Sequence, residues 1–347
     1  MNSLLEHRGP DGEGTWIHPR EVAAFAHRRL AIIDLVTGHQ PMTDEGGNWI
    51  TYNGEIYNYV ELRTLLGESR FRTRSDTEVL LHGYRQWGED SLERLRGMFA
   101  FALWDEESST LLCARDRFGI KPLYYAIVDG VFLFASEAKA LLPFLPEIAT
   151  DLEGFKDYLS FQFCLAGKTL FKGVHELPPG HFLRVRNGTV EVKRYWEVYF
   201  EPDFERTEAY FERRLTELLH DSIKLHLVSD VPVGAYVSGG VDSGIVASLA
   251  AECGSDLAGF TGSFSMPGYD ERHYARELAE VREFELHEIE ITESDFAQRI
   301  EDVVYHLDFP VAGPGSFPQF MVSELASHHR KVVLGGQGGD ELSLIHI

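Results

Sequence analysis

The amino-acid sequence predicts two domains of different fold class: an α+β domain in the first half, and an α/β domain with a parallel sheet in the second. At 347 residues the chain has the length of two ordinary domains. Residues 49–142 have mainly strand-like patterning with one helical pattern, which is typical of sheets layered with helices. Beyond residue 207, strand and helix patterns alternate as in βαβ units.

Turn signals in the first half predict two β-hairpins. A polar turn at residues 105–109 interrupts one apolar run, and Asp129-Gly130, a strong hairpin signal, interrupts another. The expected strand pairs are 98–104 with 111–115 and 123–128 with 131–135. A helix is expected over 77–87, where apolar side chains recur at helical spacing.

A segment without a clear period separates the two halves. It covers residues 195–203 and contains Pro202, so we expect a linker at 196–206 between a domain of residues 1–195 and one of 207–347. The second domain is expected to begin with an amphipathic helix whose apolar stripe is Phe211, Leu215, Leu218, Leu219 and Ile223. Alternating strands and helices are then expected at 231–237, 241–253, 257–264, 271–281, 286–291, 295–306, 317–329 and 332–334.

Composition and charge narrow the classes of function. A formal net charge of -23 argues against nucleic acid or an anionic membrane as the main partner. Cys113, Cys164 and Cys253 show no C-x-x-C spacing, which indicates a reducing compartment and neither a zinc site nor a disulfide framework. The sequence shows no apolar run of membrane-spanning length and no signal-peptide pattern, so a cytoplasmic location is expected.

The motif with the clearest chemistry is Ser238-Gly239-Gly240-Val241-Asp242-Ser243, between a predicted strand and a predicted helix. Two glycines allow close approach of an anion, and the helix N-terminus supplies unpaired N–H groups. The serine hydroxyls add donors, and Asp242 can hold the Mg²⁺ that accompanies nucleotide phosphates. The motif lacks the lysine of a Walker loop and resembles the loop of ATP pyrophosphatases. The alternative is an ordinary Gly/Ser turn.

A series of motifs in the first half extends this resemblance. In chain order they are His7–Asp11, Arg29–Asp34, Tyr52–Asn58, Ser75–Glu78, Arg115–Tyr125 and Leu177–His181. With the loop at 238–243 they resemble the glutamine-dependent asparagine synthetases from His7 to Glu341. The resemblance implies an N-terminal-nucleophile-type glutaminase domain, a sandwich of sheets and helices, followed by an α/β ATP-pyrophosphatase domain.

The resemblance also implies roles for individual residues. In the first domain, Arg29 would bind the α-carboxylate of glutamine, and Glu55 and Asp76 would hold its α-ammonium group. The side chain of Asn53 and the N–H of Gly54 would form an oxyanion hole, and a strand from Arg29 to Ile33 would wall the pocket.

In the second domain, backbone at Tyr236 and Gly262 would bracket the adenine, and Gly335 and Gly336 would lie against the nucleotide. The loop at 238–243 would hold pyrophosphate, and Asp242 and Asp340 would coordinate Mg²⁺. ATP and Mg²⁺ are the implied cofactors, and glutamine and aspartate or another carboxylic acid the implied substrates. The implied chemistry is adenylation of aspartate by ATP, followed by displacement of AMP by ammonia from glutamine. A homodimer is possible.

Three departures from the family pattern modify these expectations. The family's nucleophile is an N-terminal cysteine upstream of the His-Arg-Gly-Pro-Asp motif, and Met1-Asn2-Ser3 holds none, while Cys113 is expected in the core. The last six residues resemble nothing in the family. We therefore expect a fragment truncated at both ends and inactive as such. Gln337 stands at the adenylate-forming position, where the synthetases have Glu, and this puts the acceptor acid in doubt.

Four interpretations remain open. The first is an asparagine synthetase, and the second a paralogue that amidates another carboxylate. The third is a β-lactam-forming relative, and the fourth a catalytically inactive nucleotide-binding fragment. The first two interpretations are favoured because the sequence retains the residues expected to bind glutamine, which are Arg29, Asn53, Gly54, Glu55 and Asp76.

Overall fold

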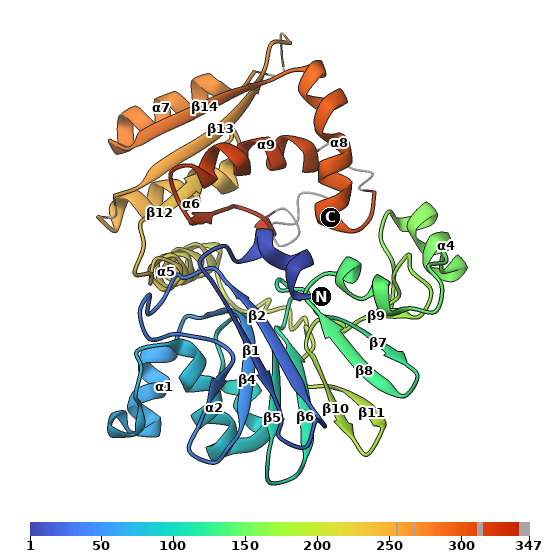
Figure 1. Ribbon diagram of the computed structural model, residues 1–347. Coiled ribbons are helices and arrows are strands. Elements are labelled where there is room, and N and C mark those ends of the chain that lie inside the picture. The colour runs from blue at the N-terminus through green and yellow to red at the C-terminus, as the bar shows by residue number, and fades with distance from the viewer. Residues whose placement is uncertain (255, 267, 269, 311–314, 340–347) are drawn as a thin grey trace. The chain divides into compact units, whose positions relative to one another are not determined.

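The computed structural model describes residues 1–254, 256–266, 268, 270–310 and 315–339 (Figure 1). The chain forms two compact units, Met1–Phe200 and Glu201–Ile347. Each unit is described by itself below.

The first unit is built on an antiparallel sheet of six strands. Their spatial order is β11 (Thr189–Arg194), β10 (His181–Arg186), β6 (Thr110–Arg115), β5 (Gly97–Asp105), β4 (Trp49–Ile56) and β3 (Met42–Thr43). Two smaller antiparallel sheets are β1 (Gly12–Ile17) with β2 (Ala24–Arg29), and β8 (Val131–Ala135) with β7 (Tyr124–Val128) and β9 (Val174–Glu176). The α-helices are α1 (Tyr59–Leu66), α2 (Asp76–Trp87), α3 (Ser91–Arg94) and α4 (Leu152–Phe161), and a 3-10 helix, η1, covers Asn2–Arg8.

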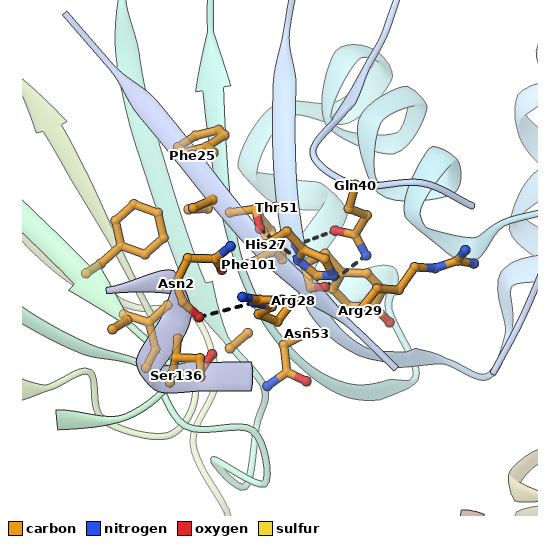
Figure 2. A pocket seen from close by; sticks show the side chains of 18 of the residues that line it. Asn2, Phe25, His27, Arg28, Arg29, Gln40, Thr51, Asn53, Phe101 and Ser136 are labelled. Carbon is orange, nitrogen blue, oxygen red and sulfur yellow. Dashed lines mark hydrogen bonds between the residues drawn. The ribbon is translucent and has the colours of Figure 1, made fainter. Parts of the chain in front are cut away.

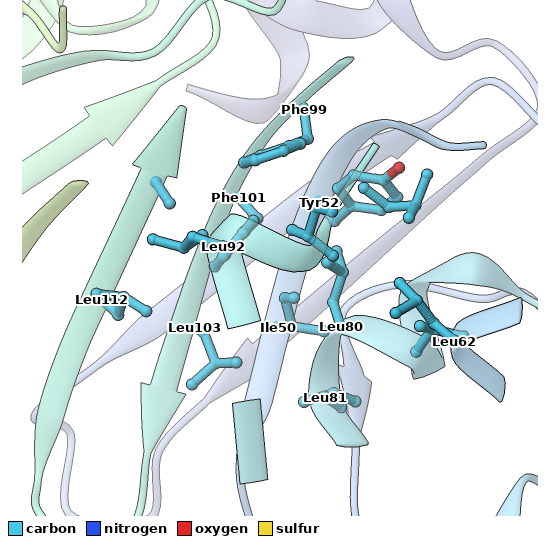
Figure 3. Packing of buried hydrophobic residues seen from close by; sticks show 14 of the residues in the cluster. Ile50, Tyr52, Leu62, Leu80, Leu81, Leu92, Phe99, Phe101, Leu103 and Leu112 are labelled. Carbon is cyan, nitrogen blue, oxygen red and sulfur yellow. The ribbon is translucent and has the colours of Figure 1, made fainter. Parts of the chain in front are cut away.

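Side chains along β5 point alternately to the two faces of the central sheet, and each face packs against a different layer of this unit. Phe99, Phe101 and Leu103 point to one face, where they pack in one cluster with buried side chains of α1, α2 and α3 (Figure 3). The residues between them, such as Ala102 and Trp104, point to the other face and pack with aromatic residues of the two smaller sheets. This period of two buries both faces of the central sheet.

Both predicted hairpins are confirmed. β5 pairs with β6, and β7 pairs with β8 so that Val128 lies opposite Val131. Asp129 and Gly130 both have positive φ, as a two-residue turn matched to the strand twist requires. The predicted helix at 77–87 is α2, which begins one residue earlier at Asp76.

The second unit is an α/β layer structure, as predicted. Its parallel sheet has the order β14 (Glu285–Ile291), β13 (Ala258–Phe264), β12 (Val233–Tyr236) and β15 (Val332–Leu334). Its helices are α5 (Glu208–His226), α6 (Val241–Glu252), α7 (Arg272–Arg282), α8 (Glu293–Leu307) and α9 (Ser316–Ser327). Helices α5, α6 and α7 share one apolar cluster with the sheet, and α9 packs with β13 in another.

Three local expectations need correction. The strand expected from residue 231 begins at Val233, because Pro232 has no N–H to donate to a ladder. The strand expected from Arg29 to Ile33 is absent: β2 ends at Arg29, and the chain then turns. The apolar stripe of α5 is buried only at Ile223, whereas Phe211, Leu215 and Leu218 are exposed.

Candidate active sites

The first unit contains a large cavity, and Figure 2 shows Arg29 and Asn53 among the residues that line it. Its volume is about 1130 Å³. The cavity walls include all six residues expected from the sequence, which are Arg29, Ile33, Asn53, Gly54, Glu55 and Asp76. These residues come from β2, the turn after it, β4 and the start of α2, so segments far apart in sequence meet at one cavity.

Asn53 and Gly54 lie side by side on β4, opposite Ala100 and Phe99 of β5. A Cβ atom on Gly54 would lie 2.2 Å from the carbonyl oxygen of Met98, so only glycine fits this close strand approach. The Nδ2 atom of Asn53 is buried and has no hydrogen-bond partner among the described residues. Buried amide donors are rarely unpaired, so this group is available to a ligand in the cavity.

Asp76 is the first residue of α2 and is held by two donors. Its Oδ2 atom accepts hydrogen bonds from the Tyr52 hydroxyl at 2.8 Å and from the backbone N–H of Ile56 at 3.0 Å. Burial raises the pKa of Asp76, although these hydrogen bonds favour the ionised form. The side chain of Ser75 caps the same helix by accepting from the N–H of Thr77.

Arg29 donates to backbone carbonyls of its own loop. One guanidinium nitrogen, Nη2, lies 2.6 Å from the carbonyl oxygen of Asp34 and 3.3 Å from that of Ile33. In Figure 2 its side chain extends away from Asn53. These contacts turn the chain after β2, which is why the expected strand from Arg29 to Ile33 does not form.

Three further residues of the cavity wall were not singled out from the sequence. The amide of Gln40 bonds both backbone groups of Tyr52, at 2.7 and 3.0 Å, and so fixes the strand next to Asn53. His27 lies 3.1 Å from the hydroxyl of Thr51, and burial together with Arg29 lowers its pKa to about 4. Burial also lowers the pKa of Lys121, with Arg8 adding to the effect. Lys121 falls within a family motif, but no sequence signal marked the other two.

None of the three cysteines is among the residues of the cavity wall in the first unit. Cys113 is fully buried on β6 among apolar side chains, as expected, and burial raises the pKa of its thiol. A buried, protonated thiol is a poor nucleophile.

Within the part of the chain that the structure describes, two strands at the cavity pair along one edge only. β2 pairs with β1, and β8 pairs with β7, and residues of both strands line the cavity. A strand edge without a neighbour presents unpaired N–H and C=O groups, so both can accept another extended segment.

In the second unit, the motif at 238–243 follows β12 and runs into the first turn of α6, so it lies between a strand and a helix N-terminus as predicted. The two serines hold the loop together, because their hydroxyl oxygens lie 2.8 Å apart and Oγ of Ser243 accepts from the N–H of Ser238 at 3.1 Å. Oγ of Ser238 also accepts from the N–H of Gly240 at 3.1 Å. The hydroxyls therefore preorganise the loop in addition to any contact with a ligand.

A second glycine-rich turn packs against the start of α6. A Cβ atom on Gly336 would lie 2.7 Å from the backbone nitrogen of Ser243, and one on Gly339 would lie 2.4 Å from Cγ of Asp242. This turn therefore lies beside the Asp242 carboxylate, as expected for two loops at the carboxyl ends of neighbouring parallel strands. A Cβ atom on Gly239 would meet the side chain of Glu271.

The remaining residues expected at a nucleotide site lie at the same end of the sheet or within it. Gly335 follows β15, and a Cβ atom there would lie 3.6 Å from the ring of Tyr236. The Tyr236 hydroxyl lies 2.8 Å from Oγ of Ser323 on α9. Gly262 is on β13, packed so closely that a Cβ atom would lie 2.9 Å from Val322. Gln337 is exposed, and Val241 is the exposed first residue of α6. Asp340 lies outside the described residues.

Comparison with known proteins decides the family. The glutamine amidotransferase domain model matches residues 1–196, and the asparagine synthase model matches residues 214–344. A putative glutamine-hydrolysing asparagine synthetase of Methanocaldococcus jannaschii is 35% identical over 99% of this chain and 71% of its own length. The chain belongs to the glutamine-hydrolysing asparagine synthetase family.

Other relatives of this synthetase family show the range of names within it. Asparagine synthetase 1 of Bacillus subtilis is 39% identical over 99% of this chain and 54% of its own length. The amidase chry2 of Gibberella zeae is 33% identical over 97% of this chain and 53% of its own length. The chain thus spans about half the length of these two relatives. A solved glutamine phosphoribosylpyrophosphate amidotransferase from B. subtilis matches with 20% identity and a TM-score of 0.41, over 74% of this chain and 60% of that one.

Proposed function

We propose that the protein containing this chain is an ATP-dependent ligase that makes asparagine from aspartate and ammonia released from glutamine. The observation that carries the proposal is the cavity of the first unit, which gathers all six residues expected for glutamine recognition. Family membership supports the same reaction class.

In the glutaminase half, the unpaired amide of Asn53 and the N–H of Gly54 would stabilise the developing oxyanion. Glu55 and Asp76 would bind the α-ammonium group, and Arg29 the α-carboxylate. For Arg29 this requires that its guanidinium exchange a loop carbonyl for the substrate. The nucleophile would be a cysteine on an extended segment that pairs with the edges of β2 and β8.

In the synthetase half, the loop at 238–243 would bind pyrophosphate with its backbone N–H groups and the start of α6. Mg²⁺ prefers oxygen ligands, and the carboxylate of Asp242 at this loop fits that preference, with Asp340 proposed as a second ligand. The aspartate side-chain carboxylate would attack the α-phosphorus of ATP and release pyrophosphate. Ammonia would then displace AMP from β-aspartyl-AMP.

The location and partners of the protein belong to the same proposal. No helix of the described residues is long and apolar enough to cross a membrane. We propose a cytoplasmic enzyme with small-molecule substrates that assembles as a homodimer and acts without nucleic acid or membrane. The formal charge of -23 supports the absence of nucleic acid and of anionic membrane surfaces as partners.

The test is product analysis with the full-length enzyme. Given Mg-ATP, glutamine and aspartate, it should form asparagine, glutamate, AMP and pyrophosphate in equal amounts. Ammonia should replace glutamine without change in the other products. Glutamine hydrolysis with no nucleotide cleavage in the presence of any acceptor acid would refute the ligase proposal.

Gln337 supports one alternative, a paralogue that amidates a different carboxylic acid. The amide side chain is exposed in the turn beside Asp242, and it replaces a carboxylate with a neutral donor. A panel of acids in the assay above separates the two. AMP formation with aspartate supports the synthetase, and AMP formation with another acid but not with aspartate supports the paralogue.

A further inference from the structure

The carboxylate of Asp34 joins two loops of the glutamine pocket that are distant in sequence. Oδ1 accepts a hydrogen bond from the backbone N–H of Thr37 at 2.8 Å, within its own loop. Oδ2 accepts from the backbone N–H of Arg74 at 2.8 Å, across a separation of forty residues. Asp34 is 9% exposed, so water competes little for these bonds.

The first of these loops carries Arg29. The carbonyl oxygen of Asp34 accepts the shortest hydrogen bond of the Arg29 guanidinium, at 2.6 Å. Asp34 has a φ of 51°, a left-handed conformation that aspartate tolerates because its short side chain bonds nearby backbone. The conformation of Asp34 therefore sets where the guanidinium of Arg29 lies.

The second loop leads directly into Asp76. Arg74 precedes the helix cap Ser75, and Asp76 follows as the first residue of α2. The other side of this loop is held by Glu78, whose carboxylate accepts from the N–H groups of Arg72 and Thr73. Glu78 ties the loop to its own helix, whereas Asp34 ties it to the loop that carries Arg29.

Asp34 is ionised in this arrangement. Burial opposes its ionisation, but hydrogen bonds from Thr37 and Arg74, together with the nearby Arg29 charge, outweigh burial and lower its pKa. A charged acceptor makes stronger hydrogen bonds than a neutral one, so the ionised Asp34 carboxylate strengthens the hydrogen bond from the Arg74 N–H.

We propose that Asp34 is a positioning residue for glutamine recognition, which holds the loop that carries Arg29 against the loop that leads into Asp76, so that both residues line one cavity. The inference rests on the proposed function. Asp34 itself touches neither group. Its effect is expected on substrate affinity, because misplacing two recognition groups weakens binding at both.

The decisive variant is Asp34→Asn. Oδ2 of Asp34 also accepts from the Thr37 hydroxyl at 2.5 Å. An amide has one acceptor oxygen, so it can keep the bond from the Thr37 N–H, or the bonds from the Arg74 N–H and the Thr37 hydroxyl, but not all three. Asp44→Asn is a matched control, because Asp44 is 8% exposed and its carboxylate also accepts two backbone N–H groups, from Gly46 and Asn48. Asp44 lies in the turn between β3 and β4, and these bonds of its carboxylate stay within that turn.

The measurement uses the full-length enzyme with glutamine and with ammonia as nitrogen donor. Asp34→Asn should raise the KM for glutamine about tenfold with little change in kcat, since affinity and not chemistry is affected. Ammonia-dependent synthesis should stay at the wild-type rate. Asp44→Asn should change neither parameter, even if it lowers the melting temperature equally. Amide hydrogen exchange should quicken at residues 30–38 and 72–77 in Asp34→Asn alone.

One result would overturn the positioning role of Asp34, and a different result would overturn the proposed glutaminase function. Equal KM values for glutamine in Asp34→Asn and Asp44→Asn, or unchanged exchange in both loops, would overturn the positioning role. A wild-type enzyme that makes the amide from ammonia but neither binds nor hydrolyses glutamine would overturn the proposed glutaminase function, and the positioning role with it.

Discussion

The Tyr52 hydroxyl and the Asp76 carboxylate form a buried hydrogen bond of 2.8 Å at the cavity of the first unit. Tyr52 is on β4 and Asp76 begins α2, so the bond joins the strand that carries Asn53 to the helix that carries the acid. Burial raises the pKa of Asp76, and the hydroxyl limits that rise by bonding the ionised form.

Tyr52→Phe should therefore change the pH dependence of glutamine binding. Without the hydroxyl the pKa of Asp76 rises further, and binding of the α-ammonium group needs the ionised acid. As pH falls, the KM for glutamine should increase at a higher pH in the variant than in the wild type. Tyr125→Phe, at a half-buried tyrosine whose hydroxyl does not bond Asp76, is the control. Superimposable pH profiles would show that the hydroxyl does not influence Asp76.

The raised pKa of Asp76 also makes the stability of the folded protein depend on pH. An acid whose pKa is higher in the folded than in the unfolded state binds its proton more tightly when folded. The free energy of unfolding should therefore fall as pH rises through the window between the usual pKa of aspartate and the raised one. Asp76→Asn should lose this dependence, measured as the difference in melting temperature from the wild type across that window.

Asp242→Asn should weaken binding of Mg-ATP. The carboxylate lies beside the turn at Gly336–Gly339, where it would reach a metal ion on the phosphates. Loss of a charge-assisted contact costs roughly 1–3 kcal/mol. Asp256→Asn removes an exposed carboxylate of the same unit and should leave the affinity unchanged. Equal Kd values for both variants and the wild type, by titration calorimetry, would contradict the assignment.

Gly336→Ala should disrupt the nucleotide site through packing alone. The new methyl group would lie 2.7 Å from the backbone nitrogen of Ser243 and would push the turn away from α6. Gly244→Ala is the matched control on α6, where the nearest atom would lie 3.9 Å away. Alanine in a helix with room is stabilising by roughly 0.5–1 kcal/mol. We expect lost Mg-ATP binding in the first variant and a higher melting temperature with normal binding in the second.

The cysteines should differ in reactivity in the order of their exposure. Cys253 is exposed, Cys164 is partly buried and Cys113 is buried. A thiol reagent should label Cys253 first and Cys113 only on unfolding, because the thiolate is the reactive form. An electrophilic glutamine analogue should leave Cys113 unmodified in peptide mass spectra. Its selective labelling in the folded protein would show that Cys113 acts as a nucleophile.

Much of the fold could be predicted because local signals agreed with the tertiary structure. The Asp129-Gly130 turn fixed its hairpin, and the alternation after residue 207 gave the parallel sheet of the second unit. The end of β2 at Arg29 could not be predicted, since it depends on bonds from a side chain to carbonyls that meet it only after folding. Burial of the α5 stripe also depends on tertiary neighbours, which cover Ile223 but not Phe211.

The sequence predicted which residues line the candidate site, but not the hydrogen bonds that hold those residues in place. Family motifs named six of the residues that line the cavity of the first unit. The contributions of Gln40 and Asp34 depend on single hydrogen bonds to Tyr52 and Arg74, whose positions no local pattern specifies. A side chain that positions another residue by bonding a distant backbone group has no recognisable pattern in a single sequence.

Transfer of oxygen from the acceptor acid to AMP tests the central claim most directly. The full-length enzyme is supplied with Mg-ATP, ammonia and aspartate whose side-chain carboxylate carries a heavy oxygen isotope, and the phosphate of the AMP is analysed by mass spectrometry. If the carboxylate attacks the α-phosphorus, each AMP formed should carry one heavy oxygen, matched to one asparagine. Unlabelled AMP, or ADP and phosphate as the nucleotide products, would contradict the adenylating mechanism and the function built on it.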